Sequence, residues 1–177
     1  MTAIPVAYRW LETMTPQPLM IRHALAEYGV IEGSGASENP AIFGWAREVG
    51  LGRVYSSDAI PWCGLFMAVI AKRANKAVPD KPLWALGWAK FGIAADRPML
   101  GDVLVFRRDG GGHVGLYAGE DSDAFHVLGG NQSDRVCFAR IARSRLHAAR
   151  RPLYRVAPAT VKPYILAVAG ELSTNEG

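Results

Sequence analysis

The sequence predicts an α+β fold in which N-terminal helices pack on an antiparallel sheet. Apolar residues recur at helical spacing as far as about residue 75, whereas after Gly101 short apolar runs alternate with Gly, Asp and Ser. Helices first and a strand meander afterwards is the layout of α+β proteins. Half of the 177 residues are hydrophobic and 20% are charged, so a domain of this size can bury a core without disulfides or a structural metal.

The helical half contains three segments with an apolar face and recognisable ends. These predicted helices are 19–28, 40–50 and 62–75. Gly29 ends the first helix, and Asn39 followed by Pro40 is a typical helix start. A longer, proline-containing connection follows, and its two tryptophans, Trp84 and Trp88, have the spacing of a short helix.

The second half contains short apolar runs separated by turn residues. We expect strands at 103–106, 113–118, 124–128 and 136–141, with 153–156 as a possible further strand. Residues 1–18 are predicted to form an N-terminal arm, and residues 157–177 a peripheral C-terminal tail. The folded domain is therefore expected to span residues 19–156.

Charge and composition argue against several classes of protein. The formal net charge is only +4, and no basic arm is interleaved with aromatic residues, so we expect no nucleic-acid partner. No apolar stretch approaches the roughly 18 residues of a membrane span, so no stable membrane insertion is expected. No secretory signal is visible, which predicts synthesis in the cytoplasm. The two cysteines, Cys63 and Cys137, form neither a disulfide framework nor a zinc motif.

Cys63 has the position of a nucleophile. It begins a predicted helix directly after Pro61 and Trp62, where the helix dipole stabilises a thiolate and is expected to lower the thiol pKa. Unpaired backbone N–H groups at the same end could hold an oxyanion. Taken alone, a structural role is the commoner one for such a cysteine. Cys137 lies in an apolar strand and is interpreted as structural.

Two further polar residues could complete a catalytic site with Cys63. His113 follows three glycines and begins a strand, and Asn131 follows the next strand, where its amide could orient a histidine. His126 is the competing histidine, although a packed strand residue is the simpler interpretation of it. The order of a cysteine on a helix N-terminus, then His113 and Asn131 on neighbouring strands, is more informative than any one residue.

These residues lie in four motifs that resemble the CHAP and NlpC/P60 superfamily of papain-like peptidoglycan hydrolases. The motifs are Pro61-Trp62-Cys63-Gly64-Leu65-Phe66, Gly101-Asp102-Val103-Leu104-Val105-Phe106, Gly112-His113-Val114-Gly115 and Leu128-Gly129-Gly130-Asn131-Gln132. The resemblance covers about residues 19–154 and is closest to a phage and bacterial subfamily. It implies a papain-like fold and makes residues 19–156 the catalytic domain.

The resemblance also implies the chemistry. Cys63 would be the nucleophile, His113 the general base and Asn131 the polar third residue, with a thioester intermediate and no cofactor or metal. Asp58 and Asp102 match acidic positions of this group, and both are interpreted as structural. The implied partner is peptidoglycan, cleaved at a muramoyl–L-alanine amide or within the stem peptide after release of the protein. A monomer is favoured.

Three readings of the role follow from this resemblance. The first is a phage or prophage lysin that a holin or a particle delivers to the cell wall. The second is an interbacterial amidase toxin with the same chemistry. The third is a catalytically silent module on the same fold that binds the wall or builds a virion. The acidic cluster Glu120, Asp121 and Asp123 is interpreted as a solvated turn and not a calcium site.

Overall fold

A six-stranded antiparallel sheet organises the part of the chain that the structure describes. In this computed structural model, residues 2–33, 38–57, 59–167 and 170–176 are described. The strands are β1 (Ile93–Ala94), β2 (Val103–Arg108), β3 (Gly111–Glu120), β4 (Ala124–Gly129), β5 (Cys137–Ala142) and β6 (Leu146–Arg151). Their order in the sheet is β1-β6-β2-β3-β4-β5, and every neighbouring pair is antiparallel. The mixed helix and antiparallel sheet confirm the predicted α+β class.

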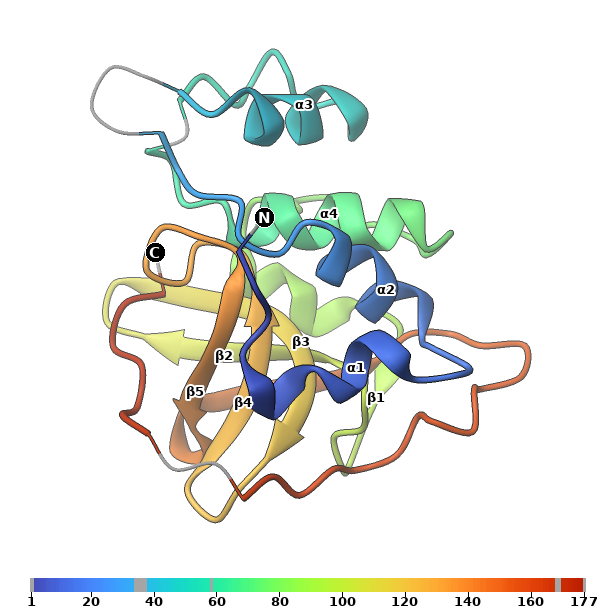
Figure 1. The fold of residues 1–177 in the computed structure, drawn as a ribbon. Helices are drawn as coiled ribbons and strands as arrows, with labels where there is room; N and C mark the ends of the chain where they lie inside the picture. Colours follow the sequence, from blue (N-terminus) through green and yellow to red (C-terminus); the bar gives the residue numbers. More distant parts are fainter. Residues whose placement is uncertain (1, 34–37, 58, 168–169, 177) are drawn as a thin grey trace.

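Helices cover one side of this sheet in layers (Figure 1). The helices are α1 (Trp10–Thr13), α2 (Leu19–Ala26), α3 (Pro40–Glu48) and α4 (Cys63–Arg73), with short 3-10 segments η1 (Val6–Tyr8), η2 (Ala85–Lys90) and η3 (Arg143–Arg145). Helix α4 lies between α3 and the sheet (Figure 1), and its residues from Cys63 to Ala71 are all buried. A helix that is apolar all round is typical of the centre of a domain.

Alternating side chains divide the sheet between two cores. Val105, Val114 and Leu116 belong to the large core shared with the helices. Phe106, Tyr117 and other residues belong to a smaller core on the opposite face. This alternation follows from the two-residue period of a strand, and it makes the register of β2 and β3 easy to specify from the sequence.

The sheet also contains strands that the sequence pattern did not reveal. Strand β6 occupies residues 146–151, and the segment 153–156, which was expected to be a possible strand, is not one. The sequence of β6 is rich in arginine, and these arginines pair with other parts of the fold: Arg151 binds Asp102, and Arg150 donates to the Phe91 carbonyl. Because β6 is held by polar contacts with residues far away in the sequence, its own sequence shows no alternation of apolar residues that would predict a strand.

The segment predicted to be an N-terminal arm packs against the domain. Leu11 is fully buried, and Tyr8 stacks on Phe138 with ring centroids 3.9 Å apart. At the other end of the chain, the Leu166 amide donates to the Glu120 carbonyl of β3. Residues on both sides of the predicted 19–156 domain therefore contribute to the same folded body.

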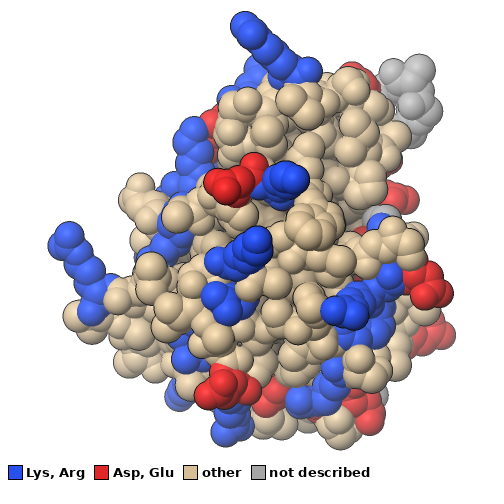
Figure 2. Space-filling model, turned by 180° about the vertical axis from the view of Figure 1, so that it is seen from behind, with Lys and Arg blue, Asp and Glu red and all other residues tan. Residues whose placement is uncertain are grey.

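Basic side chains are dispersed on the face of the molecule that Figure 2 shows. Figure 2 shows Lys and Arg side chains spread over the face opposite to that of Figure 1 and separated by uncharged surface. A single basic stripe of the kind that follows a nucleic-acid backbone is not seen on this face. Among the described residues, no helix has the length and apolar character needed to cross a bilayer.

Candidate active site

Cys63 is the first residue of α4 and is almost completely buried, at 3% exposure. The residue before it, Trp62, offers no side-chain cap to the helix. The first N–H groups of α4 have no intrahelical acceptor. Trp62 is itself anchored, because its indole N–H donates to Glu32 at 2.9 Å. This end of the helix is therefore rigid and presents backbone donors beside the sulfur.

Two glycines allow other segments to press against the start of α4. A Cβ at Gly64 would lie 2.2 Å from the Pro82 carbonyl oxygen, so only glycine admits the connection between α4 and η2. A Cβ at Gly130 would lie 2.6 Å from the Cβ of Phe66, so the turn after β4 also needs glycine to reach the helix. These contacts bring three separate segments together around Cys63.

Burial keeps the Cys63 sulfur in its thiol form. Desolvation raises the pKa of the thiol, and the backbone N–H groups of Val114 and Gly64, which face the sulfur, offset only part of that effect. The expected lowering of the pKa by the helix terminus is thus present in direction but is outweighed by burial. The contact with Val114 also places the sulfur beside the residue that follows His113.

His113 lies in β3 and is held by Gln132. Its Nε2 is 3.0 Å from Gln132 Oε1, and the Gln132 amide nitrogen donates to the carbonyls of Val127 and Cys137 at 3.2 and 2.6 Å. Because the amide nitrogen is engaged elsewhere, the oxygen must face the imidazole, so Nε2 carries the proton. Nδ1 then keeps a free lone pair, and it has no hydrogen-bond partner among the described residues.

The orienting contact that was expected of Asn131 is made by its neighbour Gln132. Asn131 is buried and adopts a left-handed backbone conformation with φ of 56°. Its Oδ1 has no hydrogen-bond partner in the described part of the chain. The left-handed residue reverses the chain after Gly129-Gly130, which directs the following side chain, and not that of Asn131, toward His113.

His113 is neutral in this environment. The side chain is fully buried, and burial lowers the pKa of the imidazole to about 4. No hydrogen bond joins His113 to the Cys63 sulfur among the described residues. The sulfur faces the backbone of Val114, whereas the His113 ring lies against Phe106 of the smaller core, with ring centroids 6.5 Å apart. The pair therefore consists of a neutral thiol and a neutral imidazole that has one unused acceptor. Catalytic hydrogen bonds are often incomplete before substrate binds.

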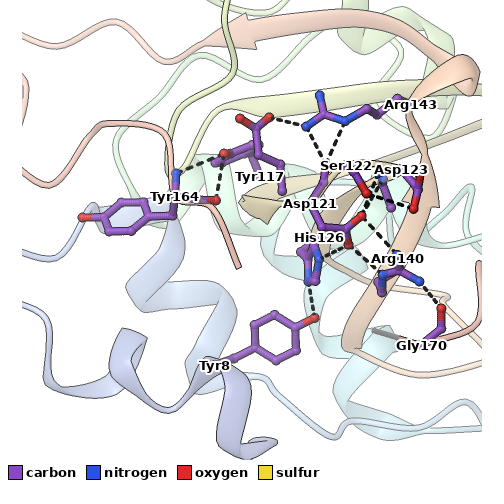
Figure 3. A network of polar contacts seen from close by, with 12 residues as sticks. Tyr8, Tyr117, Asp121, Ser122, Asp123, His126, Arg140, Arg143, Tyr164 and Gly170 are labelled. Atoms are coloured by element: carbon purple, nitrogen blue, oxygen red, sulfur yellow. Dashed lines mark hydrogen bonds and ion pairs between the residues drawn. The ribbon is translucent and has the colours of Figure 1, made fainter. Parts of the chain in front are cut away.

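The competing histidine, His126, belongs to a separate network that ties the N-terminal residues to the sheet (Figure 3). Tyr8 Oη is 2.6 Å from His126 Nδ1, and His126 Nε2 is 2.7 Å from Asp121 Oδ2. Asp121 also accepts hydrogen bonds from Arg140. Both ring nitrogens of His126 are thus engaged, which favours the structural interpretation of this residue.

The acidic residues near this network face arginines and backbone donors. Asp121 Oδ1 accepts from the amides of Asp123 and Ala124, and Glu120 pairs with Arg143. Within the described residues, no group of three or more His, Cys, Asp or Glu side chains could hold a metal ion. The structure thus places these carboxylates in a turn and in ion pairs.

Asp102 and Asp58 are the other two acidic residues that the sequence motifs drew attention to. Asp102 is fully buried and accepts hydrogen bonds from Arg151 and from the Met99 amide, so it holds the start of β2 in place. Asp58 lies outside the described residues. Sequence reasoning did not single out Gln132 as a site residue, although it is part of the quoted Leu128–Gln132 motif.

A shallow hollow lies on the connection that presses on Gly64. It has a volume of about 360 Å³, and its lining residues are Pro79, Asp80, Lys81, Trp84, Gly87 and Lys90. Trp84 is 56% exposed, whereas Trp88 is fully buried. Only the first of the two tryptophans is therefore available to a ligand.

No known protein-family model matches this chain, and no curated protein is similar enough to count as a relative.

Proposed function

We propose that this protein is a papain-like cysteine hydrolase of the CHAP or NlpC/P60 type that cleaves an amide bond in peptidoglycan. The observation that carries the proposal is the free Nδ1 lone pair of a buried, oriented His113 on the strand beside the Cys63 sulfur. A structural histidine normally uses both ring nitrogens, as His126 does. Nucleophilic catalysis by a thiol requires an imidazole with an unused acceptor, and His113 has one on a strand whose next residue, Val114, faces the Cys63 sulfur.

The mechanism uses only groups of this chain. His113 Nδ1 takes the proton of the Cys63 thiol as the sulfur attacks the amide carbonyl carbon. The backbone N–H groups at the start of α4, which carry no side-chain cap, stabilise the oxyanion. The imidazolium then protonates the leaving amine, and the C–N bond breaks to leave a thioester. Water, deprotonated by His113, hydrolyses the thioester and regenerates the thiol.

The Gln132 carboxamide supports both protonation states of His113. Its oxygen accepts the Nε2 proton in the neutral imidazole and continues to accept it in the imidazolium that forms during the reaction. Gln132 is therefore proposed as the positioning residue, in the place that the motif resemblance gave to Asn131. For the glycan part of the substrate, the exposed Trp84 offers a stacking surface on the connection that contacts Gly64.

A second candidate is a catalytically silent wall-binding or virion-structural module on the same fold. The observation that favours it is the burial of both Cys63 and His113 together with the absence, among the described residues, of a hydrogen bond between them. A hydrolase requires the thiol and the imidazole to come within hydrogen-bonding distance during turnover. A silent module has no such requirement.

Digestion of purified peptidoglycan separates the two candidates. Gram-negative and Gram-positive walls are incubated with the wild-type protein, with Cys63→Ser and with Cys137→Ser, and the soluble fragments are analysed by mass spectrometry. The proposed hydrolase yields fragments with wild type and Cys137→Ser but not with Cys63→Ser. The fragment masses then separate a muramoyl–L-alanine amidase from a stem-peptide endopeptidase. Sedimentation with the wall but no fragments from wild type contradicts the proposal and favours the silent module.

A further inference from the structure

The hollow on the connection between α4 and η2 has an aromatic side that is held in place. Trp84 lies against Gly87, where an added Cβ would be 3.0 Å from the ring atom Cε3. The Trp84 amide donates to the Lys81 carbonyl, and the Gly87 amide donates to the Trp84 carbonyl, at 3.1 and 2.9 Å. The indole is nevertheless 56% exposed. A ligand therefore meets an aromatic surface that it does not have to order.

Two lysines line this hollow, and the ammonium groups of both are unpaired. Of the five lysines in the chain, Lys72 and Lys76 donate to backbone carbonyls and Lys162 lies over an aromatic ring. Lys81 and Lys90 line the hollow, and their side chains have no hydrogen bond or ion pair within the described part of the chain. An ammonium group is a compact point charge, so these two lysines are available to an anionic ligand.

The lining of the hollow matches a sugar that carries a carboxylate. The indole suits the apolar face of a sugar ring, and the Asp80 carboxylate can accept hydrogen bonds from hydroxyl groups. The two ammonium groups suit a single anionic substituent, whereas the charge of Asp80 repels a polymer that carries a phosphate on every unit. The volume of about 360 Å³ falls within the range of small-molecule sites, about 300–1,000 Å³.

The hollow has a fixed position relative to the start of α4. Pro82 belongs to the same connection, and its carbonyl oxygen lies 2.2 Å from the place of a Cβ on Gly64, the residue after Cys63. The indole N–H of Trp88 donates to this carbonyl at 2.9 Å, which anchors the connection from its other side. A ligand in the hollow is therefore held at a constant distance from the Cys63 end of the helix.

We propose that the hollow binds a sugar of the N-acetylmuramic acid class, with its ring on Trp84 and its lactyl carboxylate between Lys81 and Lys90. In a wall glycan this carboxylate is free where the stem peptide has been removed, so the hollow holds the protein on strands that have already been processed. The role of this sugar in the wall rests on the proposed hydrolase function, whereas binding of the sugar does not.

The first test titrates the isotope-labelled full chain with N-acetylmuramic acid and with N-acetylglucosamine, which differ only in the lactyl group. Both sugars should move the indole N–H signal of Trp84 in NMR spectra and leave that of the buried Trp45 in place. N-acetylmuramic acid should bind about threefold to tenfold more tightly at low salt, and added salt should reduce this preference. Equal affinities, or a Trp84 signal that neither sugar moves, overturn the proposal.

Variants of the lining residues assign the two parts of the ligand. Trp84→Ala should weaken the binding of both sugars by about tenfold, and Trp84→Phe, which keeps a ring, should recover most of that loss. The double variant Lys81→Gln/Lys90→Gln should bind the two sugars equally. Lys72→Gln/Lys162→Gln removes the same charge outside the hollow and should keep the preference. Retention of the preference in the first double variant, or its equal loss in both, contradicts the carboxylate assignment.

Soluble glycan strands freed of stem peptides connect the site to the wall. They should bind the Cys63→Ser protein more tightly than the same strands whose carboxylates have been amidated, and Lys81→Gln/Lys90→Gln should remove the difference. If wall digestion yields no fragments but these preferences are found, the hydrolase proposal fails and the sugar site stands. If digestion proceeds and no preference is found, the hydrolase stands and the sugar site fails.

Discussion

Gln132 Oε1 lies 3.0 Å from His113 Nε2, and this contact decides which nitrogen of the imidazole can act as a base. Because the Gln132 amide nitrogen is bound to two backbone carbonyls, the carboxamide cannot turn over without losing both hydrogen bonds. The proton therefore stays on Nε2, and Nδ1 remains the acceptor.

The first prediction concerns the choice between Gln132 and Asn131. Gln132→Leu removes the acceptor, so wall hydrolysis should fall by about tenfold or more in kcat. Gln132→Glu keeps an acceptor and adds a negative charge, so the acidic limb of the pH profile should move to higher pH. Asn131→Gly, which suits the left-handed backbone at φ of 56°, should change activity much less.

Nitrogen chemical shifts of the His113 ring provide a readout that needs no substrate. They should report a proton on Nε2 in wild type and in Asn131→Gly, and a mixture of tautomers in Gln132→Leu. A large loss of activity in Asn131→Gly with little change in Gln132→Leu would instead assign the positioning role to Asn131.

The second prediction concerns the protonation state of Cys63. Since burial raises the pKa of this thiol, alkylation by iodoacetamide should be slow near neutral pH and should accelerate above pH 9, the ordinary value for a thiol. The rate is best followed in a Cys137→Ser background, because Cys137 is partly exposed. Rapid alkylation that is already at its plateau near pH 6 would indicate a preformed thiolate–imidazolium pair and contradict the structure.

The third prediction concerns the close approach of the Pro82 carbonyl to α4. Gly64→Ala places a Cβ 2.2 Å from that oxygen, so the backbone must shift and the free energy of unfolding should fall by about 1–3 kcal/mol. Gly44→Ala is the matched control, because it lies within α3 with no atom within 4 Å of the added Cβ. It should raise the free energy of unfolding by about 0.5–1 kcal/mol. Chemical denaturation of both variants checks the difference, and equal effects would contradict it.

The fourth prediction concerns stability against pH. The pKa of folded His113 is lowered to about 4 from 6.5, so between these values the unfolded chain binds the proton more readily than the folded one. The contribution of neutral His113 to the free energy of unfolding is therefore fully present above pH 6.5. It is lost as the pH falls toward 4, by at most about 3 kcal/mol. The lowered pKa of His126 acts in the same direction.

Denaturation between pH 7 and pH 4 measures this loss. The stability of His113→Gln should be less sensitive to acid than that of wild type. A slope that is identical in wild type and His113→Gln would mean that His113 is not buried in its neutral form.

The local parts of this protein could be predicted from its sequence. Apolar periodicity located α2, α3 and α4 and the strands from β2 to β5 close to their observed bounds, because each of these elements buries one face or all of its surface. The same reasoning placed Cys63 at a helix N-terminus and His113 in a strand. These features depend on neighbours in the sequence, so the sequence alone determined them.

Tertiary structure decided which side chains meet. Gln132 rather than Asn131 contacts His113 because a single left-handed residue redirects the turn, and sequence cannot tell which of two adjacent amides that turn delivers. Burial of Cys63 by the surrounding domain has a larger effect on the pKa of its thiol than the helix terminus has. The pairing of Glu176 with Arg145, and the insertion of β6 between β1 and β2, join residues far apart in the chain. Such contacts follow from the packing of the entire fold, for which no local pattern exists.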